Sequence, residues 1–298
     1  MRLQRTIKQE VRFEGIGLHS GRPVRITLKP APRDHGVTFF RKDRGVFIKA
    51  SFQNVIDTAF ATTIGVDGVR IRTVEHLLAA LSGLCIDNIL VEIEGPEVPA
   101  MDGSAISFIE YILKAGIVNQ AKRASYLEVK RPFLYEEPGI RIMALPYSGR
   151  KFTYNLELPQ GPLKKQSISI ELNEETFLSH IAPARTFGFL KDVEYLRKNG
   201  LALGGSLSNA VVIDEERVLN AEGLRFPDEF ARHKVLDMLG DLYLAGYQIL
   251  GHIVSWKSGH SSNIKFLKKM LSSGSLKIIT EETLKREEAL PLKSLYFQ

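Results

Sequence analysis

Apolar residues recur along this chain with two periods, and each period predicts a different element. Alternation of apolar and polar residues, as at 24–28, predicts a half-buried strand, whereas an apolar stripe every three to four residues predicts a helix. In both halves of the chain strands come before helices, an order that favours two α+β layers over a single βαβ sheet. Strands are expected at 24–28, 89–93, 126–129, 151–158, 166–172 and 249–256, and helices at 73–84, 104–115, 192–199, 227–245 and 265–271.

A polar stretch at 119–125 separates the two halves and is expected to be a linker. The length of 298 residues suits about two domains, each able to bury its own core. We therefore expect an N-terminal domain over 1–121, a C-terminal domain over 126–275 and a tail over 276–298. The last four residues, 295–298, resemble the remnant of a protease tag.

Composition is ordinary for a soluble globular protein, with 44% hydrophobic and 25% charged residues. The formal net charge is +6 and the pI is about 9.2. This basic excess suits either a solvated surface or an anionic partner, such as a diphosphate or an anionic membrane face. No run of five Lys and Arg occurs and no basic stretch is interleaved with aromatic residues, so the sequence argues against nucleic-acid binding.

Cys85 is the only cysteine, which excludes an internal disulfide and a thiolate zinc cluster and suits a reducing cytoplasm. The N-terminus lacks the apolar core of a signal peptide, and no apolar run is long enough to span a membrane. We therefore expect a cytoplasmic protein whose association with a membrane is at most peripheral.

Three ionisable residues lie on one stripe of the helix predicted at 227–245. His233, Asp237 and Asp241 follow one another at intervals of four, which places them within an arc of roughly 80° on a largely apolar helix. Ionisable side chains on a largely apolar helix are costly to bury unless another group satisfies them. A metal ion and a salt-bridge network with Arg232 or Lys234 are both consistent with this pattern.

A second histidine, His76, lies in the first turn of the helix predicted at 73–84 and directly follows Glu75. If the two helices face each other, His76, His233 and Asp237 provide three protein ligands and leave a position for water, as in catalytic zinc sites. Glu75 could then act as a general base, although a carboxylate in a first turn also suits the helix dipole.

His260 is expected in a flexible turn after the strand at 249–256. Such a histidine is either solvated or a general acid. In the second case Asp241, one helical turn beyond Asp237, would accept a hydrogen bond from its other ring nitrogen and raise its pKa.

Eight short motifs occur together in this chain, between about residue 10 and residue 265. They are GIGLHSG (15–21), RTVEHL (72–77), MDGSA (101–105), ARTFGF (184–189), GGSL (204–207), GLRF (223–226), RHKVLD (232–237) with GDL (240–242), and SGH (258–260). With this set, in this order, the chain resembles the UDP-3-O-acyl-N-acetylglucosamine deacetylases, the zinc enzymes of lipid A biosynthesis in Gram-negative bacteria.

The resemblance implies an α+β fold of two similar domains, each a two-layer α/β sandwich, with the active site between them. It also implies hydrolysis of an acetamide on a UDP-linked, acylated glucosamine by a monomer. It assigns His76, His233 and Asp237 to zinc and Glu75 to the general base. Two histidines and one carboxylate also suit Fe(II).

The same resemblance assigns further roles around the metal. His260 would protonate the leaving amine, Asp241 would orient it, and Thr186 would stabilise the oxyanion together with zinc. Lys234 would contact the substrate near the metal, and Lys257 would contact the diphosphate.

Family members also build an apolar passage for the acyl chain from an insert in the second domain. One departure concerns Leu145, where some relatives carry a lysine that contacts the substrate, so affinity rather than chemistry could differ here. The positions that match the passage are Phe187, Phe189, Leu190, Val193, Gly205, Ser206 and Val212, although their pattern alone would predict plain core for some of them.

Two other interpretations compete with the deacetylase. A related metal hydrolase acting on another amidated sugar has the same ligand set. A non-catalytic basic module would use the stripe as an ion network. Glu75 and His260 argue against the latter, because metal binding alone requires neither.

Overall fold

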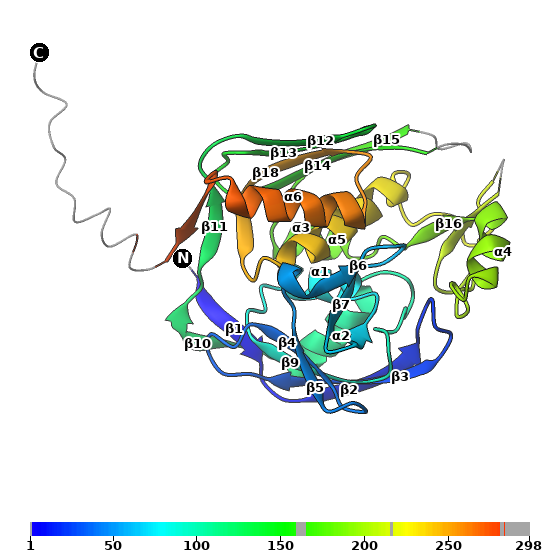
Figure 1. The fold of residues 1–298 in the computed structure, drawn as a ribbon, viewed down its shortest axis with the longest axis horizontal. Helices are drawn as coiled ribbons and strands as arrows, with labels where there is room; N and C mark the ends of the chain where they lie inside the picture. The colour runs from blue at the N-terminus through cyan, green and yellow to red at the C-terminus, as the bar shows by residue number, and fades with distance from the viewer. Residues whose placement is uncertain (1, 159–164, 215–216, 281–282, 284–298) are drawn as a thin grey trace, which may run out of the picture.

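The computed structural model describes residues 2–158, 165–214, 217–280 and 283 (Figure 1). Two large sheets lie at opposite sides of the molecule, and most of the helices lie between them (Figure 1). The fold is therefore α+β, as expected. The expected tag remnant at 295–298 lies outside the described residues.

The sheet of the first half has five strands in the order β2-β3-β9-β4-β5. Its alternation buries Val24, Ile26 and Leu28 of β3 while Arg25 points to solvent, as the period of two predicts. Helices α1 and α2 lie on its inner side (Figure 1). The elements are β2 (Val11–Ile16), β3 (Pro23–Pro30), β4 (Val37–Arg41), β5 (Val46–Lys49), α1 (Glu75–Gly83), β9 (Ile89–Glu94) and α2 (Ile106–Ala115).

The sheet of the second half has seven strands around the long central strand β18. β18 pairs with β11 and β14 in parallel and with β13 antiparallel, and β12, β15 and β19 extend the sheet. Helices α5 and α6 lie on its inner side (Figure 1). The elements are β11 (Tyr126–Val129), β12 (Phe133–Glu137), β13 (Ile140–Leu145), β14 (Arg150–Glu157), β15 (Lys165–Glu171), α5 (Glu229–Tyr243), β18 (Gln248–Trp256), α6 (His260–Ser272) and β19 (Leu276–Ile279).

Three small sheets and several short helices complete the described fold. β6, β7 and β8 form one small sheet, β16 pairs with β17, and β1 pairs with β10. Helix α4 lies beside β16 at the edge of the molecule (Figure 1). The elements are β1 (Leu3–Ile7), η1 (Phe52–Asn54), β6 (Val55–Asp57), β7 (Thr63–Val66), β8 (Val69–Ile71), β10 (Ile117–Arg123), α3 (Glu174–Thr176), η2 (Phe177–Ile181), β16 (Phe187–Phe189), α4 (Leu190–Lys198) and β17 (Val211–Ile213).

Three expectations about the chain's course are corrected by the structure. The polar stretch at 119–125 is not a free linker, because most of it lies in β10 and pairs with β1. The last helix begins at His260 rather than at residue 265, so His260 is not in a flexible turn. The tail expected from residue 276 begins with β19, which pairs with β11.

Helices α1 and α5 pack directly against each other at the centre of the molecule. All nine residues of α1 are buried, and Gly240 of α5 lies against the backbone of Glu75 at the start of α1. A Cβ at residue 240 would lie 2.0 Å from the carbonyl oxygen of Glu75, closer than any real contact. Gly240 is therefore what allows the two helix backbones to approach so closely.

We expect Gly240→Ala to destabilise the protein by about 1–3 kcal/mol or more, because overpacking outweighs the helix propensity of alanine. Denaturant unfolding measures this loss. Gly188→Ala is the matched control, since a Cβ there meets nothing within 4 Å. Equal stability of the two variants would contradict the close approach.

Candidate active site

His76, His233 and Asp237 converge where α1 meets α5, as the sequence predicts. His76 is the second residue of α1, and His233 and Asp237 lie on successive turns of α5. Asp237 Oδ1 lies 3.5 Å from His76 Nε2 and 3.2 Å from His233 Nε2. All three side chains are buried, and one ligand atom from each lies within 4.8 Å of the others.

The chemical state of this triad fits a divalent cation. Asp237 Oδ1 is buried and has no hydrogen-bond partner among the described residues. Burial lowers the pKa of His76, which favours the neutral imidazole that binds metals. Although burial opposes it, the neighbouring His233 and Lys234 hold the pKa of Asp237 well below its usual range. Two imidazole nitrogens and a carboxylate oxygen suit Zn²⁺ or Fe(II).

The alternative ion network is present only in part. Lys234 Nζ donates to Asp237 Oδ2 at 2.8 Å, while Arg232 pairs with Asp228 one turn earlier. The lysine engages one carboxylate oxygen and leaves the other facing the histidines. His233 Nδ1 lies 3.1 Å from the carbonyl oxygen of Ala184, a contact that directs its Nε2 toward Asp237.

Glu75, His260 and Asp241 form a second group beside the triad. His260 Nε2 lies 3.7 Å from Glu75 Oε1, and His260 Nδ1 lies 2.9 Å from Asp241 Oδ2. Burial raises the pKa of Glu75 to about 8. Burial would lower the pKa of His260, but the carboxylates of Asp241 and Glu75 raise it to about 10.

Two residues in this group escaped the sequence analysis. The hydroxyl of Thr62 donates to Asp241 Oδ1 at 2.5 Å, and its backbone N–H donates to Glu75 Oε2 at 3.0 Å. Asn263 Nδ2 donates to Asp241 Oδ2 at 2.9 Å. Thr62 precedes β7 and has no spacing signal. Asn263 lies three residues after His260. This helical spacing could have been recognised only if α6 had been predicted to begin at His260.

The remaining polar candidates are Lys234, Lys257 and Thr186. Lys234 Nζ lies 5.4 Å from the centre of the Phe187 ring, beside the triad. Lys257 follows β18, and its Nζ pairs with Glu157 at 2.7 Å. The backbone of Thr186 bonds to Gly103 and Val211, and its hydroxyl has no hydrogen-bond partner among the described residues.

The apolar candidates lie on one protruding unit, formed by β16, α4, β17 and the loop between α4 and β17. The Phe187 ring lies 4.6 Å from that of Phe230 and 6.2 Å from that of His233, so the unit begins at the triad. No residue of α4 is buried. Phe189 is half-buried in β16, Leu190 and Val193 are in α4, Gly205 and Ser206 are in the loop, and Val212 is in β17.

A family model described as UDP-3-O-acyl N-acetylglycosamine deacetylase matches residues 4–272. The chain belongs to this family. Several relatives named UDP-3-O-acyl-N-acetylglucosamine deacetylase are similar over nearly their whole length. The protein of Thermodesulfovibrio yellowstonii is 52% identical over 94% of this chain and 96% of its own. Those of Nitratidesulfovibrio vulgaris and Oleidesulfovibrio alaskensis are 50% and 48% identical, over 92% and 96% of this chain and 89% and 96% of their own.

Membership of the deacetylase family makes the protein a hydrolase and confirms the resemblance drawn from the motifs. In the part of the chain that the structure describes, no helix is both long and apolar enough to cross a membrane.

We expect Thr62→Val to destabilise the protein by about 1–3 kcal/mol, because the nearly isosteric side chain leaves Oδ1 of the buried Asp241 carboxylate without its hydroxyl donor, while Oδ2 keeps His260 and Asn263. Thr63→Val is the matched control: the neighbouring hydroxyl is buried without a partner, so its loss should be neutral or stabilising. Urea unfolding in a buffer free of added anions compares the two. If Thr63→Val lowered the free energy of unfolding more than Thr62→Val, the hydrogen bond from Thr62 to Asp241 would not stabilise the fold.

Proposed function

We propose that this protein hydrolyses the acetamide of UDP-3-O-(3-hydroxyacyl)-N-acetylglucosamine to acetate and the free amine, as the committed step of lipid A biosynthesis. We also propose that it uses Zn²⁺ and works as a cytoplasmic monomer. The names of its relatives support the substrate. The single cysteine supports the compartment.

One observation carries the proposal for the chemistry. Glu75 and His260 face each other across 3.7 Å, directly beside the three candidate ligands His76, His233 and Asp237. A site that only stored a metal would need neither a buried carboxyl nor a buried imidazole there. A site that hydrolyses an amide needs both, because one proton must leave water and one must reach the leaving nitrogen.

His76, His233 and Asp237 would hold the ion. When bound, Zn²⁺ supplies Lewis-acid polarisation of the amide carbonyl and makes water more acidic. Asp237 can serve as a ligand through Oδ1 while Oδ2 remains paired with Lys234. The contact between His233 Nδ1 and Ala184 keeps the other ring nitrogen turned toward the site.

Glu75 would accept the proton of the attacking water at Oε1. Its pKa of about 8 lies close to the range in which a general base works best near neutral pH. His260, with a pKa of about 10, carries its proton at neutral pH and would donate it from Nε2 to the amine nitrogen as the C–N bond breaks. Asp241 would hold His260 through Nδ1, and the unpaired hydroxyl of Thr186 would donate to the oxyanion.

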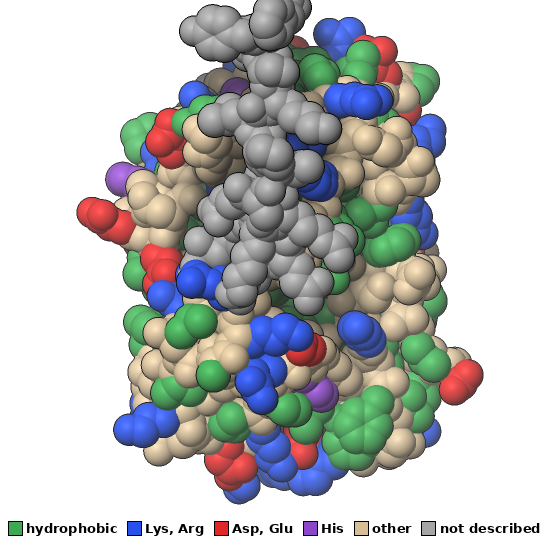
Figure 2. Space-filling model, turned by 90° about the vertical axis from the view of Figure 1, so that its left-hand side faces the viewer, with side chains coloured by type: hydrophobic (Ala, Val, Ile, Leu, Met, Phe, Trp, Pro, Cys, Tyr) green, Lys and Arg blue, Asp and Glu red, His purple; other side chains and the backbone are tan. Residues whose placement is uncertain are grey.

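The surroundings suit the remaining parts of the substrate. Lys234 supplies a cation beside the triad. Lys257 would leave its ion pair with Glu157 and pair with the diphosphate of the substrate instead. The acyl chain would follow the apolar unit that begins at Phe187. On the part of the surface visible in Figure 2, Lys and Arg side chains are scattered among acidic ones, so the net charge is not gathered into one stripe there.

We expect Glu75→Ala to keep its metal and to lose roughly 10²–10⁴-fold in turnover, because only proton transfer is removed. His233→Ala should lose the metal itself. Metal analysis and acetate release, measured on the same samples, separate the two effects. Full activity of Glu75→Ala would show that this carboxyl is not the base.

We expect Lys257→Met to raise KM roughly tenfold or more with little change in kcat, because a charge-assisted hydrogen bond to the diphosphate is lost. Lys265→Met is the control, since Lys265 also pairs with a glutamate, at 3.1 Å, but on α6. Steady-state kinetics checks both variants. Equal KM values would place the diphosphate elsewhere.

The deciding experiment is acetate release from UDP-3-O-(3-hydroxymyristoyl)-N-acetylglucosamine by the purified protein. Loss of activity with a chelator and recovery with Zn²⁺, but not with Mg²⁺, is the expected result. Bound metal without acetate release would favour a related amidase acting on another N-acylated sugar. Neither metal nor activity would leave the triad as an ion-pair network.

A further inference from the structure

The backbone of residues 182–186, in the second half of the chain, is hydrogen-bonded both to the turn at 101–105 of the first half and to helix α5. Each of the five residues takes part in one such bond or in a bond to Arg225, so the segment is fixed residue by residue. Ala182 O accepts from Ala105 N–H at 3.0 Å, Pro183 O from Arg225 Nη1 at 2.8 Å and Ala184 O from His233 Nδ1 at 3.1 Å, while Arg185 N–H donates to Glu229 Oε1 at 3.0 Å and Thr186 N–H to Gly103 O at 2.7 Å.

One of these bonds reaches a candidate metal ligand. The carbonyl oxygen of Ala184 can only accept, so Nδ1 of the buried His233 carries the ring proton and donates it. The other ring nitrogen, Nε2, then keeps its lone pair and faces Asp237 Oδ1 at 3.2 Å. The position of the Ala184 carbonyl therefore sets both the tautomer and the direction of the His233 ring.

The residue before Ala184 is held by Arg225, which belongs to the GLRF motif at 223–226. Arg225 Nη1 donates both to Pro183 O and to Asp102 Oδ2, at 2.8 Å each. Although burial raises it, the bonds from Arg225 and Ser104 hold the pKa of Asp102 below its usual range, so its carboxylate is charged. One guanidinium nitrogen thus joins a carboxylate of the first half to the backbone beside Ala184, and we call this contact the Arg225 link.

The same turn of the first half also holds the segment on the other side of Ala184. Gly103 has a φ of +83°, and a Cβ there would lie 2.2 Å from the carbonyl oxygen of Asn209. Because Gly103 has no side chain, the turn approaches the second half closely enough for its carbonyl oxygen to accept from Thr186 N–H. The first half therefore fixes the backbone on both sides of the carbonyl that orients His233.

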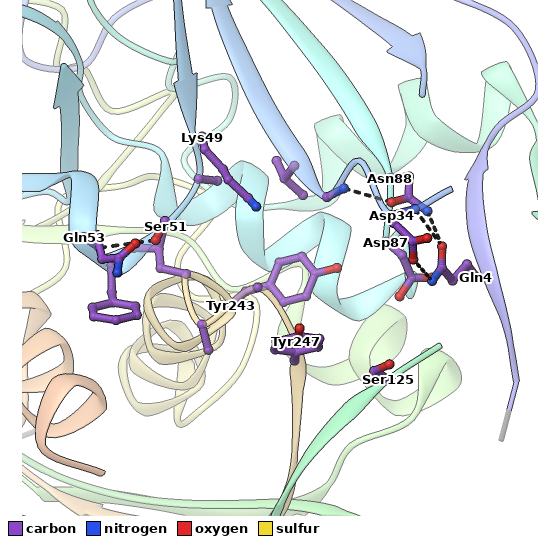
Figure 3. A pocket seen from close by; sticks show the side chains of 17 residues that line it. Gln4, Asp34, Lys49, Ser51, Gln53, Asp87, Asn88, Ser125, Tyr243 and Tyr247 are labelled. Atoms are coloured by element: carbon purple, nitrogen blue, oxygen red, sulfur yellow. Dashed lines mark hydrogen bonds between the residues drawn. The ribbon is translucent and has the colours of Figure 1, made fainter. Parts of the chain in front are cut away.

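The two halves are also joined at Tyr243, where the contact has no such consequence. The hydroxyl of Tyr243, at the end of α5, donates to the carbonyl oxygen of Ile86 at 2.6 Å. Tyr243 lines a cavity of about 350 Å³ between the halves (Figure 3). Among the residues that the structure describes, those lining this cavity include none of the three candidate ligands. The Tyr243 bond is therefore a contact between the halves that does not orient a ligand.

We propose that Arg225 is a positioning residue for the candidate metal site. By holding Pro183 against Asp102, it keeps the carbonyl of Ala184 at the place where it orients the ring of His233. The inference rests on the proposed function, because it takes His233 to be a metal ligand. The first half then contributes to the site in two ways, with His76 as a ligand and with Asp102 as the anchor of a segment that orients a ligand of the second half.

The test is the affinity for Zn²⁺, measured by titrating the Zn²⁺-loaded full chain with a chromogenic chelator. Arg225→Gln should bind Zn²⁺ about tenfold more weakly, at the lower end of the loss that follows removal of an outer partner of a histidine ligand. Asp102→Asn tests the Arg225 link from its other side. It keeps the size of the side chain but removes the charge, so it should weaken Zn²⁺ binding in the same direction by a smaller factor.

Tyr243→Phe is the control for a purely structural effect. It removes a hydrogen bond between the halves and should lower the midpoint of urea unfolding, but it should leave the affinity for Zn²⁺ unchanged. If Arg225→Gln kept its full affinity, or if Tyr243→Phe lost as much, Arg225 would only join the halves and the inference would be overturned. If the unchanged protein bound no Zn²⁺ in the same assay, the proposed metal site would itself be wrong, and the inference with it.

Discussion

The close approach of α1 and α5 is the constraint on which the site depends. Gly240 faces the backbone of Glu75 with no side chain between them. The candidate ligand from α1 and the two candidate ligands from α5 can therefore meet, because a wider separation of the helices would take His76 out of reach of Asp237. The absence of a Cβ at Gly240 thus allows the geometry of the candidate metal site.

The buried charges beside this contact are arranged as a connected set. Asp241 accepts from Thr62, Asn263 and His260. Thr62 also donates its backbone N–H to Glu75, so one residue holds both the proposed base and Asp241, the partner of the proposed acid His260. Such a network rigidifies a site when every member is satisfied. The buried, unpaired Oδ1 of Asp237, which faces the two histidines, is the point at which a cation would complete this set.

The sequence predicted the parts of the site that follow helical spacing. Residues four apart lie on one face of a helix, so the sequence places His233, Asp237 and Asp241 on one stripe. It also places Glu75 next to His76 in the chain. What the sequence could not predict are contacts set by tertiary packing. Thr62 approaches Asp241 across 179 positions of the chain. The segment at 119–125 reads as a linker because its polar residues face solvent, yet strand pairing with β1 depends on backbone groups that no side-chain pattern encodes. The start of α6 was missed because Gly259 and Ser262, rather than an apolar stripe, mark it.

The pairing of β10 with β1 changes what the connection between the halves can do. A flexible linker would let the two ligand-bearing helices sample many relative positions, and a metal ion would have to overcome that entropy on binding. Here the crossing chain is itself a strand, bonded along its length to the first strand of the protein. The effective concentration of His76 at the His233 and Asp237 pair is therefore set by the fold before any ion arrives, and the affinity of the candidate site for a cation would depend in part on a strand pair outside the site.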